Sequence, residues 1–83
     1  MKVRVRYFAS IREALGADES IELFSGATVS ELRDCLIASS PTHAAALSRE
    51  RALRSALNQL LCDESAVVGE DAEVAFFPPV TGG

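Results

Sequence analysis

The last two residues of the sequence, Gly82 and Gly83, are the ones whose types and spacing could carry chemistry. Neither has a Cβ, so a catalytic groove too narrow for any side chain could still reach the Gly83 carboxyl carbon. At neutral pH this carboxylate is ionised, since its usual pKa is about 3.3 to 3.7, and it resists nucleophilic attack. A partner enzyme would therefore have to activate it, most simply as an acyl adenylate made from ATP. A sulfur nucleophile attacking that anhydride would leave Gly83 as a thiocarboxylate with a deliverable sulfur.

The other side chains do not form a recognisable catalytic set. His43 is the only histidine and stands at a predicted helix start, so we expect a surface or capping role for it. No serine or cysteine has an evident base partner, and no glycine-rich phosphate loop is visible. Three acidic pairs fall in predicted turns, where solvated carboxylates explain them better than a metal site: Asp18-Glu19, Asp63-Glu64 and Glu70-Asp71. We therefore expect a chain that is carried to an enzyme, with no metal and no permanently bound cofactor.

The two cysteines, Cys35 and Cys62, do not form a C-x-x-C motif and have no neighbouring histidine. A zinc or redox site is therefore not indicated. One of them could relay sulfur, but free thiols are common in protein cores. We expect both to be core residues.

The composition describes one small acidic domain. The 83 residues are 48% hydrophobic and 24% charged, as in ordinary globular chains. The net charge of −4 argues against nucleic-acid binding, which would need a basic face. No apolar run is long enough to cross a membrane and no leader is visible, so we expect a cytoplasmic protein without membrane association. Lys2 is the only lysine, so we do not expect this protein to form chains of itself through isopeptide bonds.

Alternating apolar and polar residues predict the strands that would position the terminus. Residues 2–8 alternate and contain β-branched side chains, so we expect Val3, Val5 and Tyr7 to face the core. Residues 20–24 alternate again, which predicts a hairpin-like return beside the first strand. Further strands are expected at 56–62, in a short segment at 66–68, and at 73–77.

Helical signals lie between these strands. Thr28 and Glu31 form a capping box at the start of the main helix, which we expect over residues 29–38 with one apolar stripe facing the sheet. A short helical turn is expected at 10–15, closed by the glycine that follows. A second short helix or turn is expected within 43–54.

This order of elements predicts an α+β domain with a β-grasp, or ubiquitin-like, fold. Such a fold would have a mixed sheet of about four to five strands with one main helix packed across it. The first and last strands would lie side by side in the middle of the sheet. Pro78 and Pro79 lack N–H donors and end the last strand. We therefore expect a single domain over 1–83, with a flexible C-terminal tail at 78–83.

Three segments resemble one known family, the small subunits of molybdopterin synthase. The most specific is the ending, Phe76-Phe77-Pro78-Pro79-Val80-Thr81-Gly82-Gly83, whereas Gly-Gly alone is shared by all ubiquitin-like carriers. The opening V-R-Y-F-A-S-I-R-E-A-L-G at 5–16 and the A-L-N-Q at 56–59 are similar to the family pattern as well. The resemblance spans essentially the whole chain and is loosest at 38–54.

The resemblance implies a sulfur carrier for molybdenum-cofactor biosynthesis. An E1-like enzyme would use ATP to adenylate Gly83, and a sulfurtransferase or cysteine desulfurase would convert it to a thiocarboxylate. The chain that carries the thiocarboxylate would dock on the large, catalytic subunit, in a heterotetramer of two small and two large chains. Sulfur would then pass to cyclic pyranopterin monophosphate to build the molybdopterin dithiolene.

The resemblance also implies which residues contact partners. By position, the family's hydrophobic contact surface corresponds to Phe8, Leu61 and Phe77, with Arg12 as an ion-pair donor. Phe8 and Phe77 could instead be core residues, and Arg12 could be a solvated turn residue. Strand parity requires Phe76 and Phe77 to face opposite sides, and we expect Phe77 to be the exposed one. The tail residues expected to enter the large subunit's pocket are Pro78, Pro79, Val80, Thr81 and Gly82.

Two other hypotheses remain open. A carrier for thiamine or tRNA thiolation would have the same fold, although the ending favours the first hypothesis. A ubiquitin-like protein modifier would instead form isopeptide bonds through Gly83. A stand-alone enzyme has the least support, because the sequence offers no acid, base or nucleophile for it.

Overall fold

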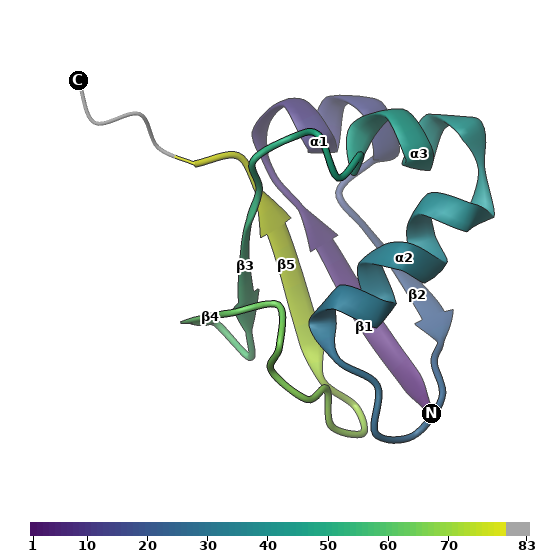
Figure 1. Ribbon diagram of the computed structural model, residues 1–83, viewed down its shortest axis with the longest axis vertical. Coiled ribbons are helices and arrows are strands. Elements are labelled where there is room, and N and C mark those ends of the chain that lie inside the picture. The colour runs from purple at the N-terminus through teal and green to yellow at the C-terminus, as the bar shows by residue number, and fades with distance from the viewer. Residues whose placement is uncertain (80–83) are drawn as a thin grey trace.

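The computed structural model describes residues 1–79, which form five strands and three helices (Figure 1). The longest helix has 11 residues, and no helix in this part of the chain is long and apolar enough to cross a membrane. In chain order the elements are β1 (Lys2–Tyr7), α1 (Ala9–Leu15), β2 (Asp18–Glu22), α2 (Val29–Ser39), α3 (Pro41–Ala46), β3 (Arg54–Leu57), β4 (Leu60–Cys62) and β5 (Glu73–Phe77).

The five strands form one mixed sheet in the order β2-β1-β5-β3-β4. Strands β1 and β5 are parallel, with Val5 opposite Val74, and all other neighbours are antiparallel. The first and last strands are therefore adjacent at the centre of the sheet. Helix α2 crosses one face, while α1 and α3 lie near the ends at which β1 and β5 finish (Figure 1). This arrangement confirms the predicted β-grasp fold.

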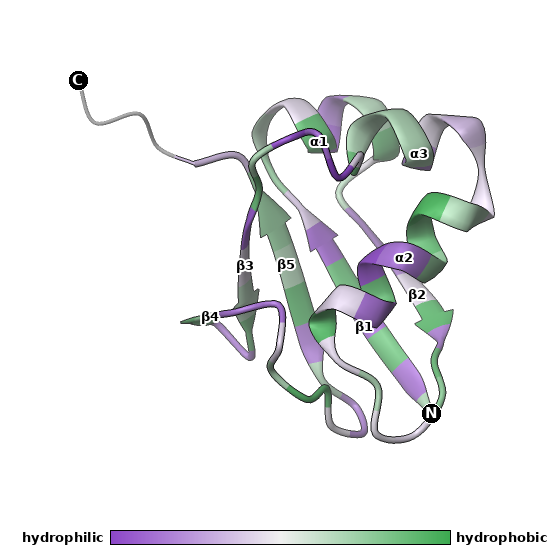
Figure 2. Cartoon of the chain, in the orientation of Figure 1, coloured by the Kyte–Doolittle hydropathy of each residue, from purple (hydrophilic) through white to green (hydrophobic). Residues whose placement is uncertain are grey.

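The core lies between α2 and one face of the sheet. On β1, Val3, Val5 and Tyr7 are buried, whereas the residues between them are exposed. Figure 2 shows this alternation of hydropathy along β1. The opposite side of the sheet, which we call the outer face, carries those exposed residues and their register neighbours on the other strands.

Helix α2 begins at the predicted capping box. The Glu31 backbone N–H donates to Thr28 Oγ1 at 3.2 Å, and the Thr28 N–H donates to Glu31 Oε1 at 3.0 Å. Both bonds satisfy N–H groups that an uncapped helix start would leave unpaired. The helix is thereby fixed in the orientation that buries Leu32 and Leu36 on the sheet.

The segment predicted as one strand over 56–62 is a hairpin, so that prediction was wrong. Asn58 and Gln59 connect β3 to β4 with φ angles of 49° and 72°. Type I′ turns need positive φ at both central residues and usually place glycine second, a position that glutamine occupies here. The predicted strand at 66–68 is also absent, because only the bridge between Val67 and Thr28 forms there.

Two other boundaries differ from the prediction. Strand β2 begins at Asp18, so Asp18 and Glu19 are strand residues rather than turn residues, and they pair in register with Arg6 and Val5. The second short helix, α3, occupies Pro41–Ala46 instead of lying within 43–54. It starts earlier because Ser40 caps it, accepting a hydrogen bond from the His43 N–H at 3.0 Å, with proline in the first turn.

Arg33 is a buried charged residue of α2 that the helical pattern did not predict, with only 4% of its surface exposed. Its guanidinium donates to the backbone carbonyls of Leu47, Ser48 and Arg51 at 2.8, 2.6 and 3.1 Å. It also donates to Glu64 Oε2 at 2.6 Å. Glu64 is therefore partly buried in a clamp between α2 and the loop that leads into β3, and it is less solvated than the sequence predicted.

Candidate partner-binding site

Phe8 and Phe77 form an apolar pair where the two central strands end. Phe8 follows β1 and Phe77 is the last residue of β5, and these strands run in parallel. The two rings meet edge to face, with centroids 6.4 Å apart and planes at 88°, a favoured geometry for aromatic pairs. Phe8 is 37% exposed and Phe77 is partly exposed. The pair therefore presents apolar surface at the point where the chain leaves the sheet toward its terminus.

Strand parity separates Phe77 from its neighbour Phe76. Phe76 is fully buried in the core, whereas Phe77 faces the outer side of the sheet. Successive side chains of a strand point to opposite faces, so one of two adjacent phenylalanines must leave the core. The prediction that Phe77 is the exposed one is confirmed. Its contact with a partner protein stays a prediction.

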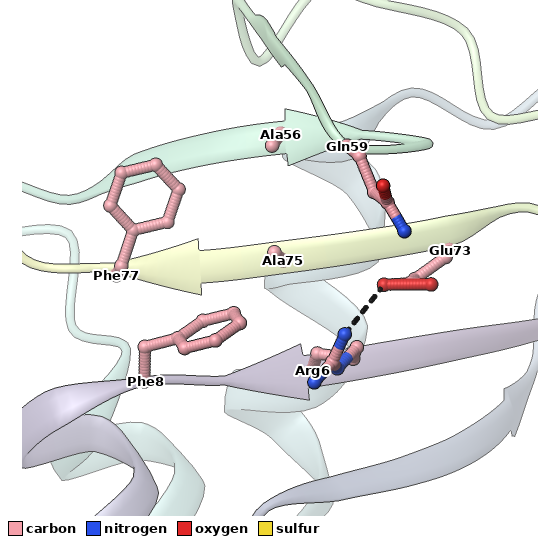
Figure 3. Close-up of a pocket in the computed structure, with 7 residues that line it drawn as sticks. All are labelled: Arg6, Phe8, Ala56, Gln59, Glu73, Ala75 and Phe77. Carbon is pink, nitrogen blue, oxygen red and sulfur yellow. Dashed lines mark hydrogen bonds and ion pairs between the residues drawn. The ribbon is translucent and has the colours of Figure 1, made fainter.

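A cavity of about 430 Å³ lies on the outer face beside this pair (Figure 3). Its floor consists of Ala56 on β3 and Ala75 on β5, which are partners in register. Two small side chains on neighbouring strands leave a hollow that larger ones surround. The surrounding residues are Arg6, Phe8, Gln59, Glu73 and Phe77.

The charges in the wall of this cavity are paired with each other. Arg6 Nη1 lies 3.3 Å from Glu73 Oε1, and the Arg6 guanidinium carbon lies 5.3 Å from the centre of the Phe8 ring. Such a partly exposed ion pair contributes little to stability. The cation–π contact also places Arg6 beside the apolar pair. The cavity is therefore apolar, with its two charged groups already neutralised.

Leu61 extends the apolar surface toward the edge of the sheet. It pairs with Ala56 in register, which places it on the outer face, and 70% of its surface is exposed. It does not line the cavity of about 430 Å³ but a second hollow of about 190 Å³, with Leu53 and Arg54 among its other lining residues. Leu61 therefore lies on the same face of the sheet as Phe77, and its contact with a partner stays a prediction.

Arg12 lies one helical turn after Phe8 on α1. The Arg12 backbone N–H donates to the Phe8 carbonyl at 3.4 Å, and Arg12 is exposed to solvent. Arg12 is therefore close to the aromatic pair, but its role as an ion-pair donor to a partner stays a prediction.

The tail is described only in part. Pro78 is half-buried and Pro79 is exposed, and neither belongs to a strand. This agrees with the prediction that the prolines end β5. The predictions for Val80, Thr81, Gly82 and Gly83 concern residues outside the described range, 1–79.

His43 was expected to have a surface or capping role, and the structure shows a partly buried side chain that contacts Ser40, the residue that caps α3. Its Nε2 lies 2.7 Å from Glu19 Oε2, and its Nδ1 lies 2.6 Å from Ser40 Oγ. The Tyr7 hydroxyl donates to the same Glu19 oxygen at 2.6 Å. The two ring nitrogens of His43 therefore contact Glu19 and Ser40 at the same time. The network joins β1, β2 and α3.

Burial and hydrogen bonding shift the acidities in this network. Burial raises the pKa of Tyr7 above its ordinary value, and the bond to Glu19 raises it further. Partial burial also raises the pKa of Glu19, but the hydrogen bonds from Tyr7 and His43 outweigh it and leave this pKa below the usual range. Both shifts favour the paired form, in which a neutral tyrosine donates to an ionised carboxylate.

The two cysteines were predicted to be core residues, and the structure places them at the edge of the core. Cys35 and Cys62 are both unpaired thiols that pack against the core, and both are only partly buried. Over residues 1–79, no three His, Cys, Asp or Glu side chains lie close enough together to hold a metal ion.

Three comparisons place this chain among known proteins. A model of the ThiS family matches residues 5–83. The molybdopterin synthase sulfur carrier subunit of Escherichia coli (strain K12) is 40% identical over 98% of this chain and 99% of its own length. The crystal structure of SAMP1 from Haloferax volcanii superposes with a TM-score of 0.80 over 100% of both chains, at 23% identity, and so shows the fold alone. A chain from the complex of subunits 1 and 2 of the molybdopterin-converting factor of Helicobacter pylori 26695 has a TM-score of 0.69 and 26% identity over 100% of both chains.

Proposed function

Since the chain belongs to the ThiS family, we propose that it is the sulfur carrier subunit of a molybdopterin synthase, acting in molybdenum-cofactor biosynthesis. The observation that carries this proposal is the 40% identity to the Escherichia coli carrier over nearly the whole of both chains. The family match also extends through Gly83, the residue to which the proposal assigns the cargo.

In the proposed cycle, the Gly83 carboxylate is the group that changes. An E1-like enzyme joins it to the AMP part of ATP and releases pyrophosphate. The outer sulfur of a persulfide on a sulfurtransferase or cysteine desulfurase attacks the carbonyl carbon, and the bond to AMP breaks. A thiol then reduces the resulting acyl disulfide, which releases the thiocarboxylate and leaves a disulfide between that thiol and the donor cysteine. In the synthase, that sulfur attacks cyclic pyranopterin monophosphate, and water hydrolyses the resulting thioester, so that the sulfur stays on the pterin and Gly83 returns to a carboxylate. ATP is consumed by the activating enzyme and does not stay bound to this chain.

The folded body serves to hold and dock the tail. Strand β5 is hydrogen-bonded on both sides, to β1 and to β3, so the tail starts from the centre of the sheet. The Phe8–Phe77 pair lies beside that start and offers apolar surface to a partner. A partner bound there would receive the tail in a fixed direction, which is the positioning that a transfer reaction requires.

The proposed docking partner is the large subunit of the synthase, in a heterotetramer of two small and two large chains. The Helicobacter pylori structure supports a partner of this kind, because it is a complex of subunits 1 and 2 of a molybdopterin-converting factor. The chemistry itself belongs to the partner enzymes, which supply the acids, bases and nucleophiles.

The proposal is tested by synthesis of molybdopterin from purified components. The thiocarboxylated chain, the large subunit and cyclic pyranopterin monophosphate are mixed, and the product is measured for wild type, for a chain lacking Gly83 and for one extended by a single residue. We expect both altered chains to unfold at the wild-type temperature and to make no product. Wild-type product from the extended chain would show that the terminal carboxyl group is not the carrier.

A further inference from the structure

The cavity beside the aromatic pair contains one polar side chain that the docking proposal does not use, Gln59. It is the second residue of the β3–β4 turn and has a φ of 72°. The turn is anchored to β5: the Asn58 N–H donates to the Glu73 carbonyl at 2.8 Å, and the Glu73 N–H donates to Asn58 Oδ1 at 3.0 Å. These two bonds fix the backbone that holds the Gln59 side chain in the cavity wall (Figure 3).

The Gln59 carboxamide has no partner among the residues that line the cavity. Figure 3 marks a single interaction there, between Arg6 and Glu73, and the amide of Gln59 stands beside this pair. A carboxamide offers two N–H donors and a carbonyl acceptor. The cavity thus combines an apolar floor of alanines with one neutral group that can both donate and accept.

These features limit what the cavity can bind. A charged occupant would lose its hydration and find Arg6 and Glu73 already paired with each other, which is unfavourable. An apolar side chain gains from burial against the alanines and the two phenylalanines. The volume of about 430 Å³ is large enough for a large side chain, and the apolar lining, whose two charges are already paired, favours an apolar one.

We propose that this cavity accepts one large apolar side chain of the large subunit, and that the Gln59 carboxamide hydrogen-bonds the backbone peptide group beside it. The inference rests on the proposed function, because it takes the large subunit as the occupant. A peptide group presents one donor and one acceptor, which a carboxamide complements. Gln59 then determines specificity, since a partner whose peptide group is already paired would leave the amide buried without a bond.

The test measures the dissociation constant of the chain and its large subunit by calorimetry. Ala75→Leu fills the cavity, and we expect binding to weaken about 30-fold or more, as for a central interface anchor. Gln59→Gly removes the carboxamide and suits the positive φ, and we expect a loss of about tenfold. Melting temperatures are recorded for every variant, and we expect neither change to lower them.

Matched controls separate the cavity from general effects. Ser20→Leu adds the same side chain to an exposed position on β2, on the outer face but away from the cavity. Asp71→Gly removes a side chain at another exposed turn position with positive φ. We expect both controls to bind within about twofold of wild type, because neither side chain lines the cavity.

The outcomes distinguish a failure of the cavity inference from a failure of the proposed docking function. If Ala75→Leu binds as wild type, the cavity is not occupied, and if Gln59→Gly binds as wild type, the peptide contact is wrong. Phe77→Ala separates the docking proposal from the cavity proposal. If this variant alone loses binding, the large subunit docks on the aromatic pair but does not fill the cavity, and the cavity inference is overturned. Wild-type binding by all three variants would contradict the docking face itself. If the chain forms dimers and Ala75→Leu abolishes them, the cavity is filled by a second copy of this chain, and the inference is overturned.

Discussion

The Phe8 and Phe77 rings meet edge to face where the parallel strands β1 and β5 end, with centroids 6.4 Å apart. One ring comes from the start of the chain and the other from the last strand, so only the folded sheet brings them together. The pair lies next to Pro78, where the chain turns away from the sheet. Docking through this pair would therefore place the tail and the partner in one fixed relation.

Phe77→Ala is expected to weaken binding of the large subunit without unfolding the domain. A central aromatic anchor contributes about 2 kcal/mol or more, which corresponds to about a 30-fold loss of affinity. Because Phe77 lies outside the core, we expect the free energy of unfolding to change by less than about 1 kcal/mol. Calorimetry and urea denaturation measure the two effects.

Phe24→Ala is the matched control for this prediction. Phe24 is 54% exposed and lies after β2, outside the residues that line the cavity. Its loss should leave affinity unchanged. If both variants weakened binding equally, the aromatic pair would not be the specific contact.

The parts of the fold that follow local patterns were predictable from the sequence. Alternation of apolar and polar residues predicted β1, and strand parity separated Phe76 from Phe77. The capping box located the start of α2 at Thr28. These features depend on residues that are close together in the chain, so the sequence displays them directly.

The missed features depend on contacts between distant segments or on unusual turn residues. The Asn58-Gln59 turn has no glycine to indicate its positive φ angles, so β3 and β4 looked like one strand. Glu19 bonds His43 across the gap between β2 and α3, and nothing near either residue indicates it. The Gln59 side chain likewise reaches the cavity only because the turn is anchored to β5.

Arg33→Ala should destabilise the domain far more than Arg49→Ala. Removing the Arg33 guanidinium leaves three backbone carbonyls and Glu64 without their buried donor, and we expect a loss of about 3–5 kcal/mol. Arg49 also pairs with Glu64, and with Asp34, but its side chain is 42% exposed, so we expect a loss below about 1 kcal/mol. Urea denaturation of both variants tests this. Equal losses would show that burial of Arg33 does not determine its effect.

Stability should fall in acid partly through Glu19. Its folded-state pKa lies below its ordinary value of 4.5, so the ionised form is favoured in the folded protein. The resulting stabilisation is fully present above 4.5 and is lost as the pH falls through the folded-state pKa. Glu19→Gln removes this titration, and we expect a shallower loss of unfolding free energy in acid. Identical pH profiles for the two proteins would contradict the role assigned to the Tyr7–Glu19–His43 network.

Gly82→Leu should block sulfur transfer while leaving the fold intact. A tunnel that excludes a Cβ would hold the bulky tail out of the reacting position, and a misplacement of this kind costs about 100-fold in rate. Gly69→Leu is the control, since a side chain there meets no atom within 4 Å and its φ is not in the left-handed region. The rate of molybdopterin formation from the thiocarboxylated chains provides the comparison. Wild-type transfer by Gly82→Leu would argue against a narrow tunnel.

The intact mass of the chain, before and after incubation with ATP, an E1-like activating enzyme and a sulfur source, tests the central claim most directly. A sulfur carrier gains the mass difference between one sulfur and one oxygen atom, and fragmentation places that gain on Gly83. An unchanged mass, or a chain joined through Gly83 to a lysine of another protein, would contradict the account.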